Sequence, residues 1–279
     1  MYQNIFLDIK KMKMHLWDDL KGHLEIPFRK YAYVKHPNGQ HVSLYGDRLK
    51  KVTQFDKDDP TLHESDVPPM TRFLVDQYGD SDEASTGHRV MFFDIEVEVT
   101  EGFPDVQKAQ NVITSIALYD STTEKYFTYV YDSKQRLKSY TKDDKVVEIY
   151  ETEYEMLNKF FQKYLEIRPT ILSGWNSEFF DIPYLYNRAV RVLGPEVANL
   201  LSPISQVIYS EYKKKHTIAG VSSLDYLQLY RQFTFTQQSS YRLDYIGEIE
   251  VGMKKVDYEG TLNDLYDNDL QTFIDYNIR

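Results

Sequence analysis

The chain has 279 residues, 42% of them hydrophobic, and this length leaves room for one large domain or two ordinary ones. It contains no cysteine, which excludes disulfides and thiolate metal sites, so that any bound metal must have oxygen or imidazole ligands. The net charge of −10 argues against a protein that coats nucleic acid, and no apolar run reaches the roughly 20 residues of a membrane span. We therefore expect a cytoplasmic soluble protein with no membrane partner.

The first part of the chain reads as short strands and turns. His36–Gln40 contains Pro-Asn-Gly and is a strong turn signal between two β-rich runs. Met70–Tyr78 is apolar with a helical period, and the polar run Asp80–Gly87 breaks the pattern after it. The sequence thus predicts a β-rich domain over residues 1–88 and a boundary near Gly87.

From residue 89 onward, strands alternate with helices. The hydrophobic pattern predicts strands over Val90–Val99, Asn111–Tyr119, Lys125–Tyr131 and Pro169–Gly174, and helices over Glu153–Ile167, Ile182–Leu193 and Asn268–Arg279. Two runs on either side of Lys213–Lys215 predict a hairpin, while Asp132–Lys145 is a charged insertion and Asp267 is a possible N-cap of the last helix. This alternation predicts an α/β domain with a mixed sheet over residues 89–279.

The sharpest chemical feature is the segment Phe92-Phe93-Asp94-Ile95-Glu96. Residues i and i+2 of a strand face the same side, so Asp94 and Glu96 project together from an otherwise apolar strand. Two neighbouring carboxylates repel each other, and burial raises the cost of ionising them. Divalent cations would relieve both problems. The alternative is an edge strand whose polar face meets water.

A second feature is the run from Ser173 to Asp181, in which a strand ends in Gly-Trp-Asn and a helix follows. Asp181 is either an N-cap that favours the helix dipole or a third carboxylate at the carboxyl edge of the sheet. Asn176 could hydrogen-bond either a neighbouring backbone group or a nucleotide. A third feature, Tyr276, lies near the end of the predicted last helix and is one of 24 tyrosines.

In this order, the three features resemble the exonuclease motifs of family B DNA polymerases, particularly those of large tailed phages. Asp94 and Glu96 match D-x-E, Asn176 with Phe180-Asp181 matches the second motif, and Tyr276 begins the third, Y-x3-D. Further similarity lies in Glu101-Gly102-Phe103-Pro104, Leu224-Asp225-Tyr226 and Leu243-Asp244-Tyr245-Ile246, so that most of residues 89–279 resemble this domain. Residues 1–88 resemble the family's N-terminal domain only weakly.

The resemblance implies an RNase H-like sheet and hydrolysis of the 3′-terminal phosphodiester with two divalent ions, Mg²⁺ or Mn²⁺. By motif, Asp94 would bridge both ions, Glu96 would bind the ion that holds the attacking water, and Asp181 would serve the second ion. Tyr276 would orient the nucleophile.

The resemblance also implies contacts with the single-stranded 3′ end of DNA. Phe103 either stacks on the terminal base or is a turn residue packed against the core, and Asn176 and Phe180 are further candidate DNA contacts. The hairpin at Lys213–Lys215 is either a solvated turn or helps to part primer from template, as in the family. We interpret Asp225 as a structural carboxylate, because its family counterpart lies outside the exonuclease motifs.

The sequence departs from the family pattern after Tyr276, where the fourth carboxylate would follow Arg279. We expect either a fragment or a naturally split protein, with the thumb, palm and fingers in cis or on a second chain, and a sliding clamp reached through that remainder. We also expect the isolated chain to bind metal loosely and cleave poorly. The palm signatures S-L-Y-P-S and D-T-D-S are absent from the 279 residues. The alternatives are a stand-alone exonuclease with four acids and a non-catalytic assembly module.

Overall fold

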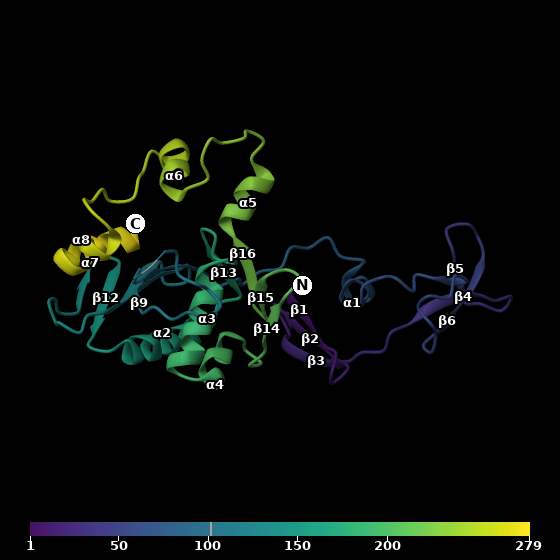
Figure 1. Ribbon diagram of the computed structural model, residues 1–279. Coiled ribbons are helices and arrows are strands. Elements are labelled where there is room, and N and C mark those ends of the chain that lie inside the picture. The colour runs from purple at the N-terminus through teal and green to yellow at the C-terminus, as the bar shows by residue number, and fades with distance from the viewer. Residues whose placement is uncertain (101) are drawn as a thin grey trace. The chain divides into compact units, whose positions relative to one another are not determined.

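The computed structural model describes residues 1–100 and 102–279, and the chain divides into two compact units, Met1–Gly87 and His88–Arg279 (Figure 1). Glu101, part of one of the segments that resemble the polymerase family, lies outside the described residues. The first unit contains β1 (Tyr2–Asp8), β2 (Lys13–Asp18), β3 (Gly22–Pro27), β4 (Ala32–Lys35), β5 (His41–Val42), β6 (Arg48–Val52), β7 (Leu62–His63) and α1 (Pro69–Tyr78).

Two small antiparallel sheets build the first unit. One has the order β1-β2-β3, and alternation along β2 turns Met14 and Leu16 into a core with Phe28 and with Phe73 of α1. The other has the order β5-β6-β4-β7. The turn predicted at His36–Gln40 is confirmed by a hydrogen bond from Gly39 N to His36 O, but β4 and β5 on either side of it both pair with β6 instead of with each other.

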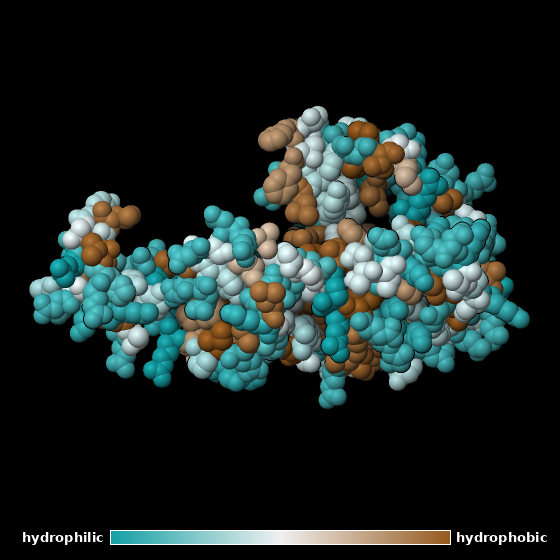
Figure 2. Space-filling view, turned by 180° about the vertical axis from the view of Figure 1, so that it is seen from behind, coloured by the Kyte–Doolittle hydropathy of each residue, from teal (hydrophilic) through white to brown (hydrophobic). Residues whose placement is uncertain are grey.

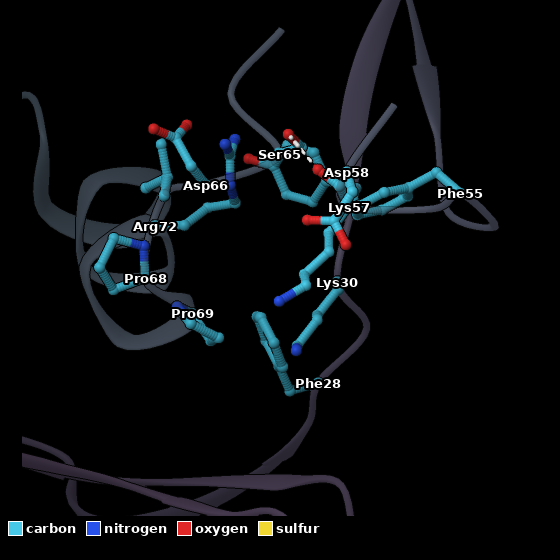
Figure 3. A pocket seen from close by; sticks show the side chains of 12 residues that line it. Phe28, Lys30, Phe55, Lys57, Asp58, Ser65, Asp66, Pro68, Pro69 and Arg72 are labelled. Atoms are coloured by element: carbon cyan, nitrogen blue, oxygen red, sulfur yellow. Dashed lines mark hydrogen bonds between the residues drawn. The ribbon is translucent and has the colours of Figure 1, made fainter. Parts of the chain in front are cut away.

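A cavity of about 400 Å³ lies within the first unit, in front of the start of α1 (Figure 3). Lys30, Lys57 and Phe28 line it on one side, and Arg72 lines it on the other. Arg72 is buried and donates to both the carboxylate and the carbonyl of Glu64, at 3.0 and 2.6 Å. This guanidinium therefore fixes the segment before α1.

The second unit contains β8 (Val90–Val97), β9 (Ile113–Asp120), β10 (Lys125–Tyr131), β11 (Tyr140–Lys142), β12 (Lys145–Tyr150), α2 (Glu153–Ile167), β13 (Ile171–Gly174), α3 (Asp181–Val192), α4 (Pro195–Ala198), the 3-10 helix η1 (Asn199–Leu201), β14 (Val207–Ser210), β15 (Lys215–Ile218), β16 (Ser222–Asp225), α5 (Tyr226–Phe233), α6 (Leu243–Val251), α7 (Leu262–Asn268) and α8 (Leu270–Ile278).

A seven-stranded mixed sheet with the order β11-β12-β10-β9-β8-β13-β16 forms the centre of this unit. Helices α2, α3 and α4 lie on one face, and α7 and α8 lie on the other (Figure 1). The predicted class, α/β with a β-rich N-terminal part, is confirmed. The predicted hairpin is also confirmed, because β14 and β15 pair antiparallel.

Both faces of the sheet are covered because its strands are apolar on both sides. Tyr129 packs into the larger core under α2, whereas its neighbour Val130 joins a smaller core with Phe273 and Ile274 of α8. The predicted helix Glu153–Ile167 has the bounds of α2, whose N-cap Thr152 accepts a hydrogen bond from Glu155 N. Each large apolar side chain buried in this way contributes about 1.5–3 kcal/mol.

Two predictions for this unit are wrong. The charged insertion predicted at Asp132–Lys145 includes β11 and the first residue of β12, which pair antiparallel with each other. Its charges did not prevent pairing because both strands lie at one end of the sheet, with polar side chains exposed. The N-cap of the last helix is Asp269, which accepts from Thr272 N, and not Asp267.

The molecular face shown in Figure 2 mixes hydrophilic side chains with scattered hydrophobic groups. Among the described residues, no helix has the length and apolarity that crossing a membrane requires.

Candidate active site

Asp94 and Glu96 lie on β8, between β9 and β13 in the sheet. Phe93 and Ile95 point into the larger core, so alternation turns the two acids toward the opposite face, on the side of α8. Glu96 is 9% exposed, and the side chain of Asp94 is 35% exposed. The interpretation of an edge strand with its acids in water is wrong, because β8 has partners on both sides.

Asp181 reaches this strand from helix α3. Its Oδ1 accepts a hydrogen bond of 3.1 Å from the backbone N–H of Ile95, the residue between Asp94 and Glu96. Asp181 is 3% exposed and is the first helical residue, while Phe180 occupies the N-cap position. The N-cap interpretation is therefore wrong: Phe180 holds that position, and the Asp181 carboxylate bonds the central strand. Asp181 thus lies beside the strand that carries Asp94 and Glu96.

The geometry of β13 makes this contact possible. β13 pairs with β8 only as far as Ser173 and Phe92, so the Ile95 N–H has no strand partner on that side. Gly174 ends β13 so close to β8 that a Cβ there would lie 2.6 Å from the Phe93 carbonyl oxygen. A glycine at this position allows the close approach that precedes Asp181.

The ammonium of Lys255 lies between the two strand acids. Its Nζ is 3.6 Å from Asp94 Oδ2 and 3.6 Å from Glu96 Oε1, and it also lies 4.3 Å from the centre of the Tyr276 ring. Burial alone would lower the pKa of Lys255, but the charges of Asp94 and Glu96 raise it above its ordinary value. Lys255 was not found from the sequence, because it lies between α6 and α7 in a stretch without periodicity.

The buried acids hold their protons more tightly than ordinary carboxyls. Burial, followed by the charge of Asp94, raises the pKa of Glu96 to about 8, although Lys255 opposes this. Burial and then Asp94 also raise the pKa of Asp181 well above its ordinary value. One ammonium therefore does not balance this group of acids, and an added cation would favour their ionised forms.

Tyr276 and Asn277, both on α8, lie beside Lys255 and Asp94. Burial raises the pKa of the half-buried Tyr276 to about 12, so its hydroxyl stays protonated at neutral pH. Asn277, 4% exposed, donates from Nδ2 to Asp94 Oδ2 at 3.1 Å and accepts from Ser115 Oγ at 2.6 Å. Asn277 thus orients Asp94. It was missed in the sequence, although it follows Tyr276 directly.

Of the predicted DNA contacts, Phe103 is exposed, whereas Asn176 and Phe180 are half-buried. Phe103 is 80% exposed, and its ring centre lies 5.2 Å from that of Phe180. Asn176 has a φ of 65°, and its backbone N–H donates to Asp225 at 3.1 Å, so its main chain is part of the turn before α3.

Asp225 is a structural carboxylate, as predicted. It is buried and accepts backbone N–H groups from Asn176 and Glu178 on one side and from Leu227 and Gln228 at the start of α5 on the other. These bonds join the turn after β13 to the turn after β16. Asp225 holds the backbone next to the site and makes no contact with Asp94 or Glu96 among those described.

The donor chemistry suits a hard cation, because the candidate ligands are carboxylates. In the part of the chain that the structure describes, no group of three or more His, Asp or Glu side chains is arranged so that it could hold a metal ion. It therefore stays a prediction that the carboxylates of Asp94, Glu96 and Asp181 lie within metal-bridging distance of one another.

Residues 75–246 match the family described as DNA polymerase family B, exonuclease domain. The chain belongs to this family. It is 36% identical over 219 residues to the DNA-directed DNA polymerase of Escherichia phage RB69, covering 68% of this chain and 24% of that protein. It is 32% identical over 234 residues to the DNA-directed DNA polymerase of Enterobacteria phage T4, covering 74% and 26%. DNA polymerase 1 of Saccharolobus solfataricus is 26% identical over 247 residues, covering 84% and 24%.

The chain thus spans about a quarter of the length of these relatives. The predicted resemblance to family B polymerases of phages is confirmed. The mixed sheet with helices on both faces is the RNase H-like architecture expected of this exonuclease domain.

Proposed function

We propose that this exonuclease domain hydrolyses the last phosphodiester bond at the 3′ end of single-stranded DNA, as the proofreading part of a family B polymerase. The supporting observation is that Asp181 accepts a hydrogen bond from Ile95, the residue between Asp94 and Glu96, on a strand within the matched family domain. Acids from two distant segments converge on one buried peptide unit, which a purely structural module does not require.

In the proposed reaction, a water oxygen attacks the phosphorus and the bond from phosphorus to the 3′ oxygen breaks. The products are a 5′-mononucleotide and DNA with a new 3′ hydroxyl. Two divalent ions, Mg²⁺ or Mn²⁺, would supply water activation and charge neutralisation at the leaving oxygen when bound. Asp94, Glu96 and Asp181 would hold them, Asn277 would keep Asp94 in place, and Tyr276 would orient the water through its neutral hydroxyl.

The 3′-terminal base would stack on Phe103, whose exposed ring lies against Phe180. Asn176 is proposed to contact the terminal nucleotide through its side-chain amide. Exposed aromatic rings suit this purpose because excision must accept any of the four bases, and every base has a π face.

We further propose a polymerase context for this domain. Residues 1–88 would serve as the N-terminal domain, and the thumb, palm and fingers would act in cis or on a second chain. A sliding clamp would be reached through that remainder. The setting would be DNA replication in the cytoplasm of an infected host cell.

The test is excision of a 5′-labelled single-stranded oligonucleotide by the 279-residue chain with Mn²⁺. We expect slow, stepwise shortening from the 3′ end that stops on chelation and is absent in Asp94→Asn and Glu96→Gln. Glu166→Gln, which changes an exposed acid on α2 outside the acid group, is the control and should retain excision. DNA binding without shortening in the unchanged chain would instead favour the assembly module, and shortening by Asp94→Asn would refute the assigned site.

A further inference from the structure

The segment that connects β8 to β9 carries Phe103 and is held from one side by helix α3. Four α3 side chains at successive i, i+3, i+4 and i+7 positions donate to its backbone carbonyls. The bonds run from Tyr184 to Asn111 O, from Asn187 to Val106 O, from Arg188 to Ala109 O and Gln110 O, and from Arg191 to Lys108 O. The helix that begins with Asp181 therefore also fixes residues 106–111.

Arg188 is the central donor of this row. Its Nη1 lies 3.2 Å from Ala109 O and 2.6 Å from Gln110 O, while Nε and Nη2 donate to the two carboxylate oxygens of Glu153 at 2.8 and 2.6 Å. Glu153 Oε1 also accepts the backbone N–H of Ile113, the first residue of β9. The bidentate pair of Arg188 and Glu153 thus joins α3 to α2. It also ties both helices to the connecting segment and to β9, the strand that follows it.

The backbone that Arg188 holds is conformationally demanding. Ala109 has a φ of 41°, in the left-handed region, and is fully buried. An alanine keeps such a conformation only where its surroundings enforce it. The guanidinium bond to the Ala109 carbonyl is one such restraint, so loss of Arg188 would let the segment relax.

Aromatic contacts join the same segment to the active-site end of α3. The ring of Phe103 lies 5.2 Å from that of Phe180, which lies 5.6 Å from that of Tyr184. Phe180 directly precedes Asp181, and the hydroxyl of Tyr184 donates to Asn111 O at 2.8 Å. The position of Phe103 relative to Asp181 therefore depends on how firmly α3 holds the connecting segment.

We propose that Arg188, oriented by Glu153, is a positioning residue for excision: it sets the place where the 3′-terminal base stacks on Phe103. This role rests on the proposed function, because it supposes that a 3′ terminus enters beside Asp181. Arg188 makes no described contact with Asp94, Glu96 or Asp181. Its loss affects capture of the terminal nucleotide and leaves the acid group intact.

The variant that tests this role is Glu153→Gln with Arg188→Met. Changing both residues leaves no unpaired buried charge, and the introduced glutamine retains an oxygen for Ile113 N, so the fold survives. The matched control is Lys163→Met with Glu166→Gln, which removes an ion pair of 2.9 Å from the surface of α2, away from the segment. Thermal unfolding of both variants checks that they are folded.

The first measurement needs no turnover: quenching of 2-aminopurine at the 3′ end of a single-stranded oligonucleotide bound to the full chain. We expect quenching in the unchanged chain, in Asp94→Asn and in the surface control, and its loss in the Glu153/Arg188 variant. Quenching by the Glu153/Arg188 variant equal to that of the unchanged chain would overturn the role of Arg188. If neither the unchanged chain nor any variant excised DNA but the difference in quenching remained, the proposed function would be refuted and the role of Arg188 would stand.

The second measurement separates positioning from catalysis. For the Glu153/Arg188 variant we expect KM for excision to rise about tenfold, the equivalent of a lost base stack, with kcat nearly unchanged. Binding of Mn²⁺ by calorimetry should match that of the unchanged chain. Adding Phe103→Ala to this variant should raise KM little further, since the stack is already lost. Additive increases in KM, or a parallel loss of Mn²⁺ binding, would show a general structural role instead.

Discussion

Replacing Glu96 by Gln should stabilise the metal-free protein at alkaline pH, against the usual expectation that removing a buried charged residue is neutral or harmful. Burial and the adjacent Asp94 raise the pKa of Glu96 from 4.5 to about 8. Between these two values the folded protein holds a proton at Glu96 that the unfolded chain has released. The free energy of unfolding therefore falls as pH rises through this range.

The size of the effect follows from the width of that interval. The rise in the pKa of Glu96 from 4.5 to about 8 corresponds to about 5 kcal/mol of unfolding free energy. This whole amount is lost only above pH 8. The pKa of about 8 already includes the opposing charge of Lys255, which lies 3.6 Å from Glu96 and would keep only Asp94 as its partner in Glu96→Gln. We therefore expect Glu96→Gln to raise the free energy of unfolding by about 2–4 kcal/mol more at pH 8.5 than at pH 5.

Urea unfolding in EDTA at pH 5 and pH 8.5 measures this difference. Glu25→Gln is the control, because a hydrogen bond from Lys13 lowers the pKa of Glu25 below its ordinary value. Its contribution is lost only as pH falls through that lowered pKa, so Glu25→Gln should behave alike at both pH values. If Glu96→Gln gave the same change in unfolding free energy at pH 5 and pH 8.5, Glu96 would be ionised throughout and the described electrostatics would be incorrect.

Three further outcomes are expected. Asp94→Ala should abolish 3′ excision by loss of a metal ligand while circular dichroism shows that the protein is still folded; retained excision would remove Asp94 from the mechanism. Gly174→Ala should cost about 1–3 kcal/mol in urea unfolding, because the new Cβ would lie 2.6 Å from the Phe93 oxygen, and a neutral result would mean that β13 can move. Asp225→Ala should cost about 2–3 kcal/mol by the same assay, since four backbone donors lose their acceptor, and a cost near zero would contradict its structural role.

The sequence predicted the parts of the fold that local periodicity determines. Helix α2 was bounded correctly because six of its residues are buried on one stripe and Thr152 marks its start. Strand β8 was found because its apolar run is continuous up to Asp94. Strand β11 was missed because its three residues, Tyr-Thr-Lys, show no apolar pattern, and only pairing with β12 makes them a strand.

The acids of the site could be predicted from the sequence, but the groups that control them could not. Spacing i and i+2 on a strand decides that Asp94 and Glu96 share a face. No local pattern indicates that Lys255, about 160 residues further along the chain, places its ammonium between them. Asn277 is equally remote from Asp94, and its role emerges only when α8 packs against β9 and β8. Charge neutralisation in this site is a tertiary property.

The position of the site follows from where the sheet is interrupted. β8 keeps its ladder with β9 through Val97, whereas its pairing with β13 ends at Phe92. A strand that loses one neighbour inside a sheet exposes backbone donors that must find another acceptor. Asp181 supplies it, and the same bond carries a carboxylate from α3 to the centre of β8. The divergence of two strands after Gly174 thus both creates the need for this acid and brings it beside the strand that carries Asp94 and Glu96.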